Sequence, residues 1–344
     1  MTEPLLSIRD LRTVFHTDEG LVRAVDGVSF DVGRGETVCL VGESGSGKTV
    51  TGESITRLIR TPPGEIAGGE IVFDGQDLTA LSDADLRALR GDRIAHVFQN
   101  PQGALNPVYT VGWQIVEAIQ LHEDVDREAA RSRAVDLLDR VGIPEATRRF
   151  DDYPHEFSGG MKQRVSLAMA LATSPDLLIA DEPTTALDVT IQNQILDLLR
   201  EIQDEFDTSI LLITHDLGVV AEVADRVVVM YAGKVMEQGG VFDVFEHPSH
   251  PYTRALLDCL PGRGEGESIG GTLPSVTDPP DGCRFHPRCA YAVDACSTGE
   301  QPPMCAANDD DDHVVSCVHY ESGGDPSVVR GDARPATTGR EDES

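Results

Sequence analysis

A glycine-rich loop near the N-terminus carries the clearest chemical pattern in the sequence. Residues 42–49 fit the pattern G-x-x-x-x-G-K-[ST] and follow an apolar, strand-like segment, Thr37–Val41. Glycines let successive backbone N–H groups curl around phosphate oxygens, and the N-terminus of a following helix adds a favourable dipole. Lys48 would reach the β- and γ-phosphates of a nucleotide, and the Thr49 hydroxyl would ligate Mg²⁺. The candidate phosphate-binding residues are Gly42, Glu43, Ser44, Gly45, Ser46, Gly47, Lys48 and Thr49.

Two adjacent carboxylates follow a second apolar segment. The residues Leu-Leu-Ile-Ala at 177–180 precede Asp181 and Glu182. An acid at the carboxyl end of a strand beside the phosphate-loop strand can hold Mg²⁺, which suits Asp181. Its neighbour Glu182 would then polarise the attacking water as a general base.

A second glycine-containing element, Ser158-Gly159-Gly160, leads into the helical pattern VSLAMALA. A serine and two glycines at a helix N-terminus form another anion cradle. Taken alone, each of the three elements has a plainer interpretation, namely a glycine turn, an exposed acidic pair or an N-cap serine. Their occurrence in one chain favours a nucleotide-hydrolysing site. The presence of two anion-binding cradles, far apart in the sequence, then requires an explanation.

Short apolar segments alternate with helical patterns through residues 1–245, which predicts one α/β domain with a largely parallel sheet. A stripe of apolar residues from Ile191 to Phe206 predicts one long helix. Residues 105–165 form a mostly helical subdomain, with helices expected at Trp113–Leu121 and Arg127–Val141. The expected strands are Leu5–Ile8, Thr37–Val41, Ile71–Phe73, Ile94–Phe98, Leu177–Ala180, Ile210–Thr214 and Arg226–Tyr231.

The remainder of the chain has a different composition. Residues 246–320 are rich in Pro and Gly and contain most of the cysteines, so we expect a small C-terminal extension. Residues 321–344 lack periodicity and are interpreted as a disordered acidic tail. A length of 344 residues agrees with roughly two domains.

Charge and hydropathy limit the classes of function. The 59 Asp and Glu residues against 28 Lys and Arg give a net charge of −31, which argues against a broad nucleic-acid-binding surface. No apolar run approaches the ~18 residues of a membrane span, and the N-terminus lacks the features of a secretory signal. We therefore expect a cytosolic chain. The acid-rich composition favours a protein adapted to concentrated salt, or else a GC-rich genome that replaces lysine by arginine everywhere except at Lys48, Lys162 and Lys234.

The order and spacing of the three motifs resemble those of the ATP-binding cassette (ABC) ATPases. Gln99 resembles the glutamine of the family's Q-loop, Asp188 lies in a segment similar to its D-loop, and His215 resembles its switch histidine. Phe15 resembles the aromatic residue that stacks on adenine. The resemblance implies a P-loop ABC-ATPase cassette with a RecA-like core, a mixed sheet and a helical subdomain.

The family mechanism implied by this resemblance uses a site shared between two subunits. Two cassettes pair head to tail, and each ATP lies between one phosphate loop and the other subunit's Ser158-Gly159-Gly160 cradle. Glu182, His215 and Gln99 would be the catalytic residues, and Asp188 would lie close to the nucleotide. The Mg²⁺ ligands would be Thr49, Gln99 and Asp181.

Further segments resemble one branch of the family, the ATPases of oligopeptide and dipeptide (and nickel) permeases. These are the segments 97–101, 104–107, 158–164, 250–257 and 282–289. The resemblance implies import of di- or oligopeptides at the cytoplasmic face of the membrane. The implied partners are a second ATPase subunit, which is this chain or a homologue, two membrane permease subunits and indirectly an extracytoplasmic solute-binding protein. The alternatives are an importer ATPase for nickel or sugars, or a soluble ABC ATPase without a transport role.

Four cysteines of the extension form a candidate metal site. Cys283, Cys289, Cys296 and Cys317 have five, six and twenty residues between successive members. Four thiolates from a loop-rich segment can ligate a [4Fe–4S] cluster or a structural Zn²⁺. A reduced, metal-free set of thiols is the third interpretation, whereas the lack of a secretory signal argues against a disulfide framework. Some permease ATPases of this type carry an iron–sulfur cluster there, and the paired C-x₂-C typical of zinc ribbons is missing.

Overall fold

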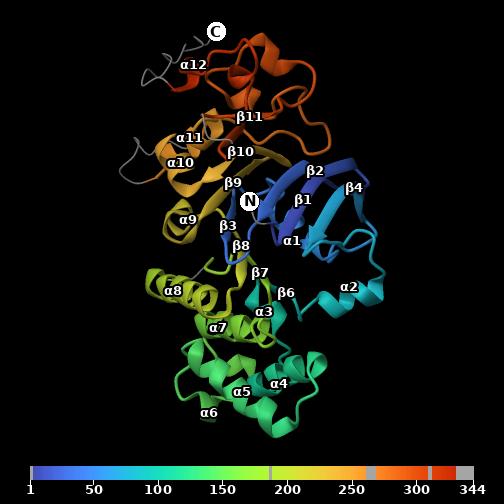
Figure 1. The fold of residues 1–344 in the computed structure, drawn as a ribbon, viewed down its shortest axis with the longest axis vertical. Coiled ribbons are helices and arrows are strands. Elements are labelled where there is room, and N and C mark those ends of the chain that lie inside the picture. The colour runs from blue at the N-terminus through green and yellow to red at the C-terminus, as the bar shows by residue number, and fades with distance from the viewer. Residues whose placement is uncertain (1–2, 186–187, 261–268, 309–311, 331–344) are drawn as a thin grey trace, which may run out of the picture.

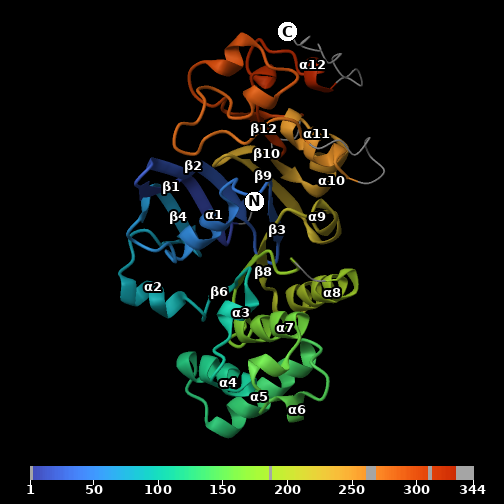
Figure 2. The same ribbon diagram turned by 180° about the vertical axis from the view of Figure 1, so that it is seen from behind.

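The protein is elongated, with the phosphate-loop region between a helical part and a C-terminal part (Figure 1). This computed structural model describes residues 3–185, 188–260, 269–308 and 312–330. Helices α4 to α7 form one end, the two sheets lie in the middle, and the segment after α11 forms the other end (Figures 1 and 2). Within the described ranges, no helix combines the length and apolar character needed to cross a membrane.

The main sheet has eight strands in the order β11-β12-β10-β9-β3-β8-β7-β6. Pairing is parallel from β9 to β6 and antiparallel from β9 to β11, so the sheet is mixed, as the family resemblance implies. The strands expected at Thr37–Val41, Ile94–Phe98, Leu177–Ala180, Ile210–Thr214 and Arg226–Tyr231 are confirmed to within one residue at each end. Their observed bounds are β3 Thr37–Val41, β6 Ile94–Val97, β7 Leu177–Asp181, β8 Ser209–Thr214 and β9 Arg226–Tyr231, and the antiparallel edge comprises β10 Lys234–Gly240, β11 Met304–Ala306 and β12 Val314–Ser316.

A second sheet of four antiparallel strands has the order β2-β1-β4-β5. The segments Leu5–Ile8 and Ile71–Phe73 lie in this sheet, so placing them in the largely parallel sheet was wrong. For Leu5–Ile8, the physical reason is the short turn between β1 and β2, which leaves no room for the helical crossover that parallel pairing needs. Ile71–Phe73 joins the same sheet because β4 pairs antiparallel with β1. The strands are β1 Leu6–Thr17, β2 Gly20–Val32, β4 Gly64–Phe73 and β5 Gln76–Asp77.

The core lies on both faces of the main sheet. Along β3, Cys39 and Val41 belong to one buried apolar cluster, while Val38 and Leu40 belong to the other. This alternation follows from the pleat, which directs successive side chains to opposite faces. The predicted long helix is confirmed as α8, whose buried residues include Ile195, Leu198, Leu199 and Ile202. The covering helices are α1 Lys48–Ile55, α2 Asp83–Leu89, α8 Val189–Phe206, α9 Leu217–Val223, α10 Val241–Glu246 and α11 Pro251–Asp258.

The helical part is inserted between β6 and β7. Helices α4 and α5 confirm the two predicted helices, and both begin at a side-chain cap, Thr110 for α4 and Asp126 for α5. Helix α7 continues past residue 165 to Ala170 and leads back towards β7. The helices are α3 Pro101–Ala104, α4 Val111–His122, α5 Arg127–Arg140, α6 Ala146–Arg149 and α7 Gly159–Ala170.

The C-terminal segment is attached to the main sheet. Strand β12 pairs with β10, with Val315 opposite Glu237, so the segment extends the sheet edge. Its remaining elements are short: η2 His286–Arg288, η3 Asp294–Ser297, η4 Val318–Tyr320 and α12 Ser327–Arg330. The tail interpreted as disordered from residue 321 begins with ordered residues, since α12 buries Val329. Residues 331–344 of that tail lie outside the described residues.

Candidate functional site

The phosphate loop joins β3 to α1. In the structure, the Lys48 ammonium donates to the carbonyl oxygens of Gly42 and Glu43 at 2.8 and 2.9 Å. Burial lowers the pKa of Lys48, against the opposing effect of the Glu182, Asp181 and Glu43 carboxylates. A buried ammonium held by loop carbonyls lies at the position from which a triphosphate would attract it.

Two glycines of the loop are required by its path. Gly42 has φ +151° and Gly47 has φ +101°, a backbone region that residues other than glycine rarely adopt. A Cβ on Gly42 would lie 2.1 Å from the Met230 carbonyl oxygen, and one on Gly47 would lie 2.3 Å from that of Ala24. The loop is therefore pressed between β9 and β2, which explains the residue type at both positions.

Asp181 ends β7 and has an unsatisfied oxygen. Its Oδ1 atom is buried and finds no hydrogen-bond partner among the described residues. Burial raises the pKa of Asp181, although a hydrogen bond from the Thr49 hydroxyl acts in the opposite direction. A buried carboxylate with an open oxygen beside a threonine hydroxyl has the donor chemistry that Mg²⁺ prefers.

The carboxylate of Glu182 is hydrogen-bonded by three side chains, each from a different loop. Its Oε2 atom accepts from Gln99 Nε2 at 2.8 Å and from Thr185 Oγ1 at 2.9 Å, and its Oε1 atom lies 3.1 Å from His215 Nδ1. Burial raises the pKa of Glu182, but the hydrogen bonds of His215, Thr185 and Gln99 outweigh it and lower the pKa overall. The backbone of Glu182 has φ +46°, which is strained for a residue with a side chain. Gln99, expected at Mg²⁺, thus contacts this carboxylate in the structure.

The second cradle lies apart from the phosphate loop of its own chain. Ser158 caps α7, with its Oγ accepting from Met161 N at 3.3 Å. Ser158 and Gly159 are exposed, and a Cβ on Gly159 would meet nothing within 4 Å. Figure 1 shows α7 beside α8 and the helical part, apart from α1. A ligand on this cradle would therefore need a second surface to enclose it.

Two further predicted residues lie in different surroundings. Asp188 caps α8 by accepting from Ile191 N at 3.0 Å, and residues 186–187 of the D-loop-like segment lie outside the described residues. Phe15 is half-buried on β1, opposite Val22 of β2. Because the carbonyl of Ala24 in β2 touches the loop at Gly47, the antiparallel sheet brings the Phe15 strand pair close to the phosphate loop.

The four cysteines of the extension are near one another and carry free thiols. Burial raises the pKa of Cys283 to about 11 and that of Cys289 and Cys317 to about 12, and the neighbouring thiols add to each rise. In the part of the chain that the structure describes, no group of three or more His, Cys, Asp or Glu side chains has an arrangement suited to a metal ion. Cys283, Cys296 and Cys317 are buried and Cys289 is partly exposed. The four thiols suit sulfur ligation in donor type, but they are not in a metal-binding arrangement.

Sequence reasoning missed two contacts on the phosphate loop. Arg288 donates to the carboxylate of Glu43, and the hydroxyl of Tyr252 accepts from the Glu43 backbone N–H. Tyr252 lies in a segment noted only for its resemblance to peptide permease ATPases. A single sequence holds no signal that pairs residues this far apart.

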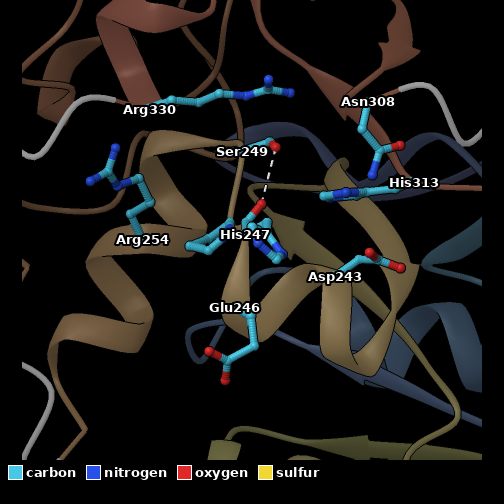
Figure 3. A pocket seen from close by; sticks show the side chains of 9 residues that line it. Asp243, Glu246, His247, Ser249, Arg254, Asn308, His313 and Arg330 are labelled. Carbon is cyan, nitrogen blue, oxygen red and sulfur yellow. Dashed lines mark hydrogen bonds between the residues drawn. The ribbon is translucent and has the colours of Figure 1, made fainter.

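A separate cavity of about 460 Å³ lies between α10, α11 and the C-terminal segment (Figure 3). Its lining includes His247, Ser249 and Arg254 from one side and His313 and Arg330 from the other. None of its lining residues belongs to the predicted nucleotide site. The cavity is therefore no candidate for ATP.

Comparisons with known proteins agree with this geometry. Residues 25–185 match the ABC transporter family, and residues 236–296 match the oligopeptide/dipeptide transporter C-terminal region. The oligopeptide transport ATP-binding protein OppD of Bacillus subtilis is 52% identical over 89% of this chain and 86% of its own length. The dipeptide transport ATP-binding protein DppD of the same organism is 48% identical over 96% of this chain and 99% of its own length.

Solved structures of cassettes are similar as well. The ATP-binding cassette MJ0796, in a dimeric post-hydrolysis state with ADP and Pi, has a TM-score of 0.63 at 28% identity and covers 69% of this chain and 98% of its own. The chain belongs to the ABC transporter family and is an ABC-type ATPase. Within that family it belongs with the ATP-binding proteins that carry the oligopeptide/dipeptide transporter C-terminal region.

Proposed function

We propose that this chain hydrolyses ATP to drive the import of di- and oligopeptides through separate membrane subunits. The names of the relatives and the match of residues 236–296 support the solute class. The observation that carries the ATPase half of the proposal is the setting of Glu182, an ionised carboxylate at the end of β7 held by Gln99, Thr185 and His215.

In the proposed reaction, Thr49, Asp181 and Gln99 would hold Mg²⁺, and Lys48 would bind the β- and γ-phosphates. Mg²⁺, when bound, neutralises the charge that develops on the transferred phosphoryl group. Glu182 accepts the proton of the attacking water. The lowered pKa of Glu182 keeps its carboxylate ionised across neutral pH, so it is available as the base. His215 and Gln99 hold this carboxylate in place until a γ-phosphate competes for them.

We propose that ATP is enclosed between two cassettes, with the Ser158-Gly159-Gly160 cradle of one subunit closing the phosphate loop of the other. The exposure of Ser158 and Gly159 supports this arrangement. Phe15 would stack on adenine, and Asp188 would lie near the nucleotide. The second cassette would be this chain or a homologue.

The remaining partners follow from the same proposal. Two membrane permease subunits would place the chain at the cytoplasmic face of the membrane, and an extracytoplasmic binding protein would deliver the solute. The proposed division is a cassette at residues 1–245, with a helical subdomain at 105–165, and an extension at 246–320. Uptake of nickel or a sugar remains the alternative solute, and a soluble ATPase the alternative class. Growth of a deletion strain on peptides, nickel-dependent medium or single sugars separates these alternatives.

For the extension, we propose that Cys283, Cys289, Cys296 and Cys317 ligate a [4Fe–4S] cluster, with Zn²⁺ or reduced thiols as the alternatives. The residue type and the mutual electrostatic influence of these thiols support the ligand set, and because they are not arranged around a metal position in the structure, their side chains would have to turn towards one another on loading. Their raised pKa values mean that loading must displace protons, so binding is expected to weaken as pH falls. Anaerobic purification with iron, sulfide and zinc analysis distinguishes the three. Cys289→Ser tests the site, and Cys305→Ser is its matched control because Cys305 is a free cysteine of the same segment outside the proposed ligand set.

We also propose that the surface is adapted to concentrated salt. The net charge of −31 leaves strong self-repulsion that molar salt screens over ~3 Å. We expect the thermal unfolding midpoint to rise steadily from 0.1 to 2 M KCl. The rise should be moderately larger than that of a neutral protein of similar size. An unchanged midpoint would favour codon bias as the origin of the composition.

Glu182→Gln tests the ATPase proposal. The amide keeps the size of the side chain but cannot accept the water proton, so turnover should fall about 10²–10⁴-fold while ATP binding persists. ATP should then hold two cassettes together, which size-exclusion chromatography detects. The control Glu205→Gln removes an exposed carboxylate that pairs with Arg140 and should leave turnover intact. Wild-type turnover in Glu182→Gln would exclude it as the general base.

A further inference from the structure

The carboxylate of Glu43, the second residue of the phosphate loop, is bound by an arginine 245 residues further along the chain. Arg288 donates from Nη1 to Glu43 Oε2 at 2.7 Å and from Nη2 to Oε1 at 3.1 Å. The Arg288 side chain is 4% exposed and that of Glu43 is 27% exposed. A two-pronged pair of this kind fixes both the position and the orientation of the carboxylate, because the guanidinium group is planar and rigid.

Arg288 is itself held by other groups. Its Nε donates to the carbonyl oxygen of Gly270 at 2.8 Å, its Nη2 to that of Ile269 at 3.0 Å, and its Nη1 to the Tyr231 hydroxyl at 3.2 Å. These bonds fix the guanidinium independently of the loop. Glu43 is therefore bound to a prearranged partner.

The backbone of Glu43 is held by a residue of α11, the helix that precedes the C-terminal segment. The hydroxyl of Tyr252 accepts from the Glu43 N–H at 2.8 Å. Tyr252 is fully buried, and its ring lies 4.7 Å from that of Tyr231 and 5.3 Å from that of Phe285, between centroids. The side chain of Glu43 is thus fixed by the C-terminal segment and its amide by α11.

These contacts extend to the catalytic ammonium. Lys48 Nζ donates to the carbonyl oxygen of the same Glu43 at 2.9 Å. Whatever fixes Glu43 therefore also fixes the carbonyl on which Lys48 rests before nucleotide binds. The carboxylate of Glu43 lies in the loop that would receive the triphosphate, where an uncompensated negative charge would repel the ligand.

We propose that Arg288 and Tyr252 are positioning residues of the nucleotide site, through which α11 and the C-terminal segment set the shape and the charge of the phosphate loop. The inference rests on the proposed ATP site and adds to it a determinant outside the cassette. Arg288 neutralises Glu43 and fixes its side chain, while Tyr252 fixes its backbone. Nucleotide affinity then depends on how α11 and the segment after it are packed.

The neighbouring Arg284 provides a matched control. It belongs to the same segment, is also buried, and donates from Nη2 to Asp26 Oδ2 at 2.5 Å. Asp26 lies on β2 and also pairs with Lys234, which would remain in place. Arg284→Gln therefore removes a comparable ion pair between the segment and the cassette without touching Glu43.

The experiment uses the full chain and measures binding of the fluorescent analogue mant-ATP with Mg²⁺, the KM and kcat for ATP, and thermal unfolding. Arg288→Gln should weaken mant-ATP binding about tenfold, because a charged pair is lost and a bare carboxylate remains. The KM should rise in parallel, with kcat at saturating ATP within about twofold of wild type. Tyr252→Phe, which removes only the hydroxyl, should weaken binding about threefold.

The double variant Glu43→Gln/Arg288→Gln gives the sharpest result. Removing the carboxylate removes the repulsion, so affinity should return to within about threefold of wild type. Arg284→Gln should lower the unfolding midpoint and leave the mant-ATP affinity within about twofold. A purely structural role would instead lower the midpoint in both arginine variants and leave the KM unchanged in both.

Wild-type affinity in Arg288→Gln, or a double variant that binds no better than the single one, would overturn the proposal. Should Arg288→Gln fail to fold, Tyr252→Phe decides, since an unchanged affinity in that variant overturns the proposal too. A wild-type chain that neither binds mant-ATP nor hydrolyses ATP would contradict the proposed function instead.

Discussion

The carboxylate of Glu182 and the imidazole of His215 face each other at the carboxyl ends of two adjacent parallel strands, with Oε1 and Nδ1 3.1 Å apart. The strands themselves enforce the contact, because Glu182 N donates to Ile213 O at 2.8 Å one step beyond the ladder. With Glu182 ionised, the Nδ1 atom carries a proton and donates a hydrogen bond to the carboxylate, which can only accept. The pair is therefore a consequence of sheet register, and its geometry makes the ionisation of Glu182 testable.

Thr185→Val should move the acid limb of the ATPase pH profile upwards. The hydroxyl of Thr185 donates to Glu182 Oε2 at 2.9 Å and helps to lower the pKa of that carboxylate. Valine keeps the shape but not the donor, so the pKa rises and the ionised base is lost at a higher pH. We expect a shift of about one pH unit or less, given partial exposure to solvent. The measurement is kcat against pH at saturating MgATP.

Thr208→Val supplies the matched control, since the Thr208 hydroxyl donates to the Pro175 carbonyl at the opposite end of the sheet. It should leave the acid limb in place. A Thr185→Val profile that overlays the wild-type curve would mean that this hydrogen bond does not influence the base.

Gly47→Ala and Gly45→Ala should differ in their effect on the nucleotide-free protein. Both glycines have positive φ, which costs an alanine about 1–2 kcal/mol. At Gly45 a Cβ meets nothing within 4 Å, whereas at Gly47 it lies 2.3 Å from the Ala24 carbonyl oxygen. Thermal unfolding should therefore show a much larger loss of stability for Gly47→Ala. Equal losses would mean that β2 moves away from the loop at little cost.

Motifs that are contiguous in the chain could be predicted from the sequence. The phosphate loop, Asp181-Glu182 and Ser158-Gly159-Gly160 each take their form from neighbouring residues, and the strand or helix beside each follows from local apolar patterns. The family resemblance implied catalytic roles for Gln99, Glu182 and His215 but not the hydrogen bonds that join them. Their assembly at one sheet edge is set by strand order, which local patterns do not encode.

The remaining features depend on pairing between distant segments. Strand β12 is a three-residue segment that is held by β10, and nothing in its own sequence marks it as a strand of the main sheet. Nothing in the sequence distinguishes Arg288 from the other arginines of its loop-rich segment, and its role depends on the fold, which places it against Glu43. Tertiary contacts decide such positions, and a single sequence carries no record of them.

The buried imidazole of His250 should make the folded protein less stable in mild acid. Burial lowers the pKa of His250 to about 3, while an unfolded histidine titrates near ~6.5. Because the folded pKa is the lower one, the contribution to stability is complete above ~6.5 and is lost progressively as pH falls towards 3. The expected loss is about 1.4 kcal/mol per pH unit below 6.5, or about 2 kcal/mol at pH 5.

The test compares thermal unfolding of wild type and His250→Asn at pH 7.5 and pH 5 in the same salt. Asparagine does not titrate and keeps an acceptor for the Tyr252 N–H, which His250 Nδ1 accepts at 3.0 Å. The midpoint should fall less in the variant between the two pH values, and the exposed His155→Asn should behave as wild type. Parallel falls in all three proteins would remove His250 as a source of acid sensitivity.

Asp181→Asn should stabilise the nucleotide-free protein while impairing its reaction. The Oδ1 atom of Asp181 is buried without a partner among the described residues, and burial raises the pKa of the carboxyl group. A neutral amide removes most of this desolvation cost, so the unfolding midpoint in EDTA should rise by about 2–6 °C. The same change removes the charge that Mg²⁺ needs, so MgATP should add less stabilisation and turnover should fall at least about 10²-fold.

The control is Asp176→Asn at the other end of β7, where the carboxylate pairs with Arg93 at 2.6 Å. That variant should lose stability and keep its response to MgATP. A lower midpoint in Asp181→Asn together with an intact MgATP response would show that Asp181 is a structural residue.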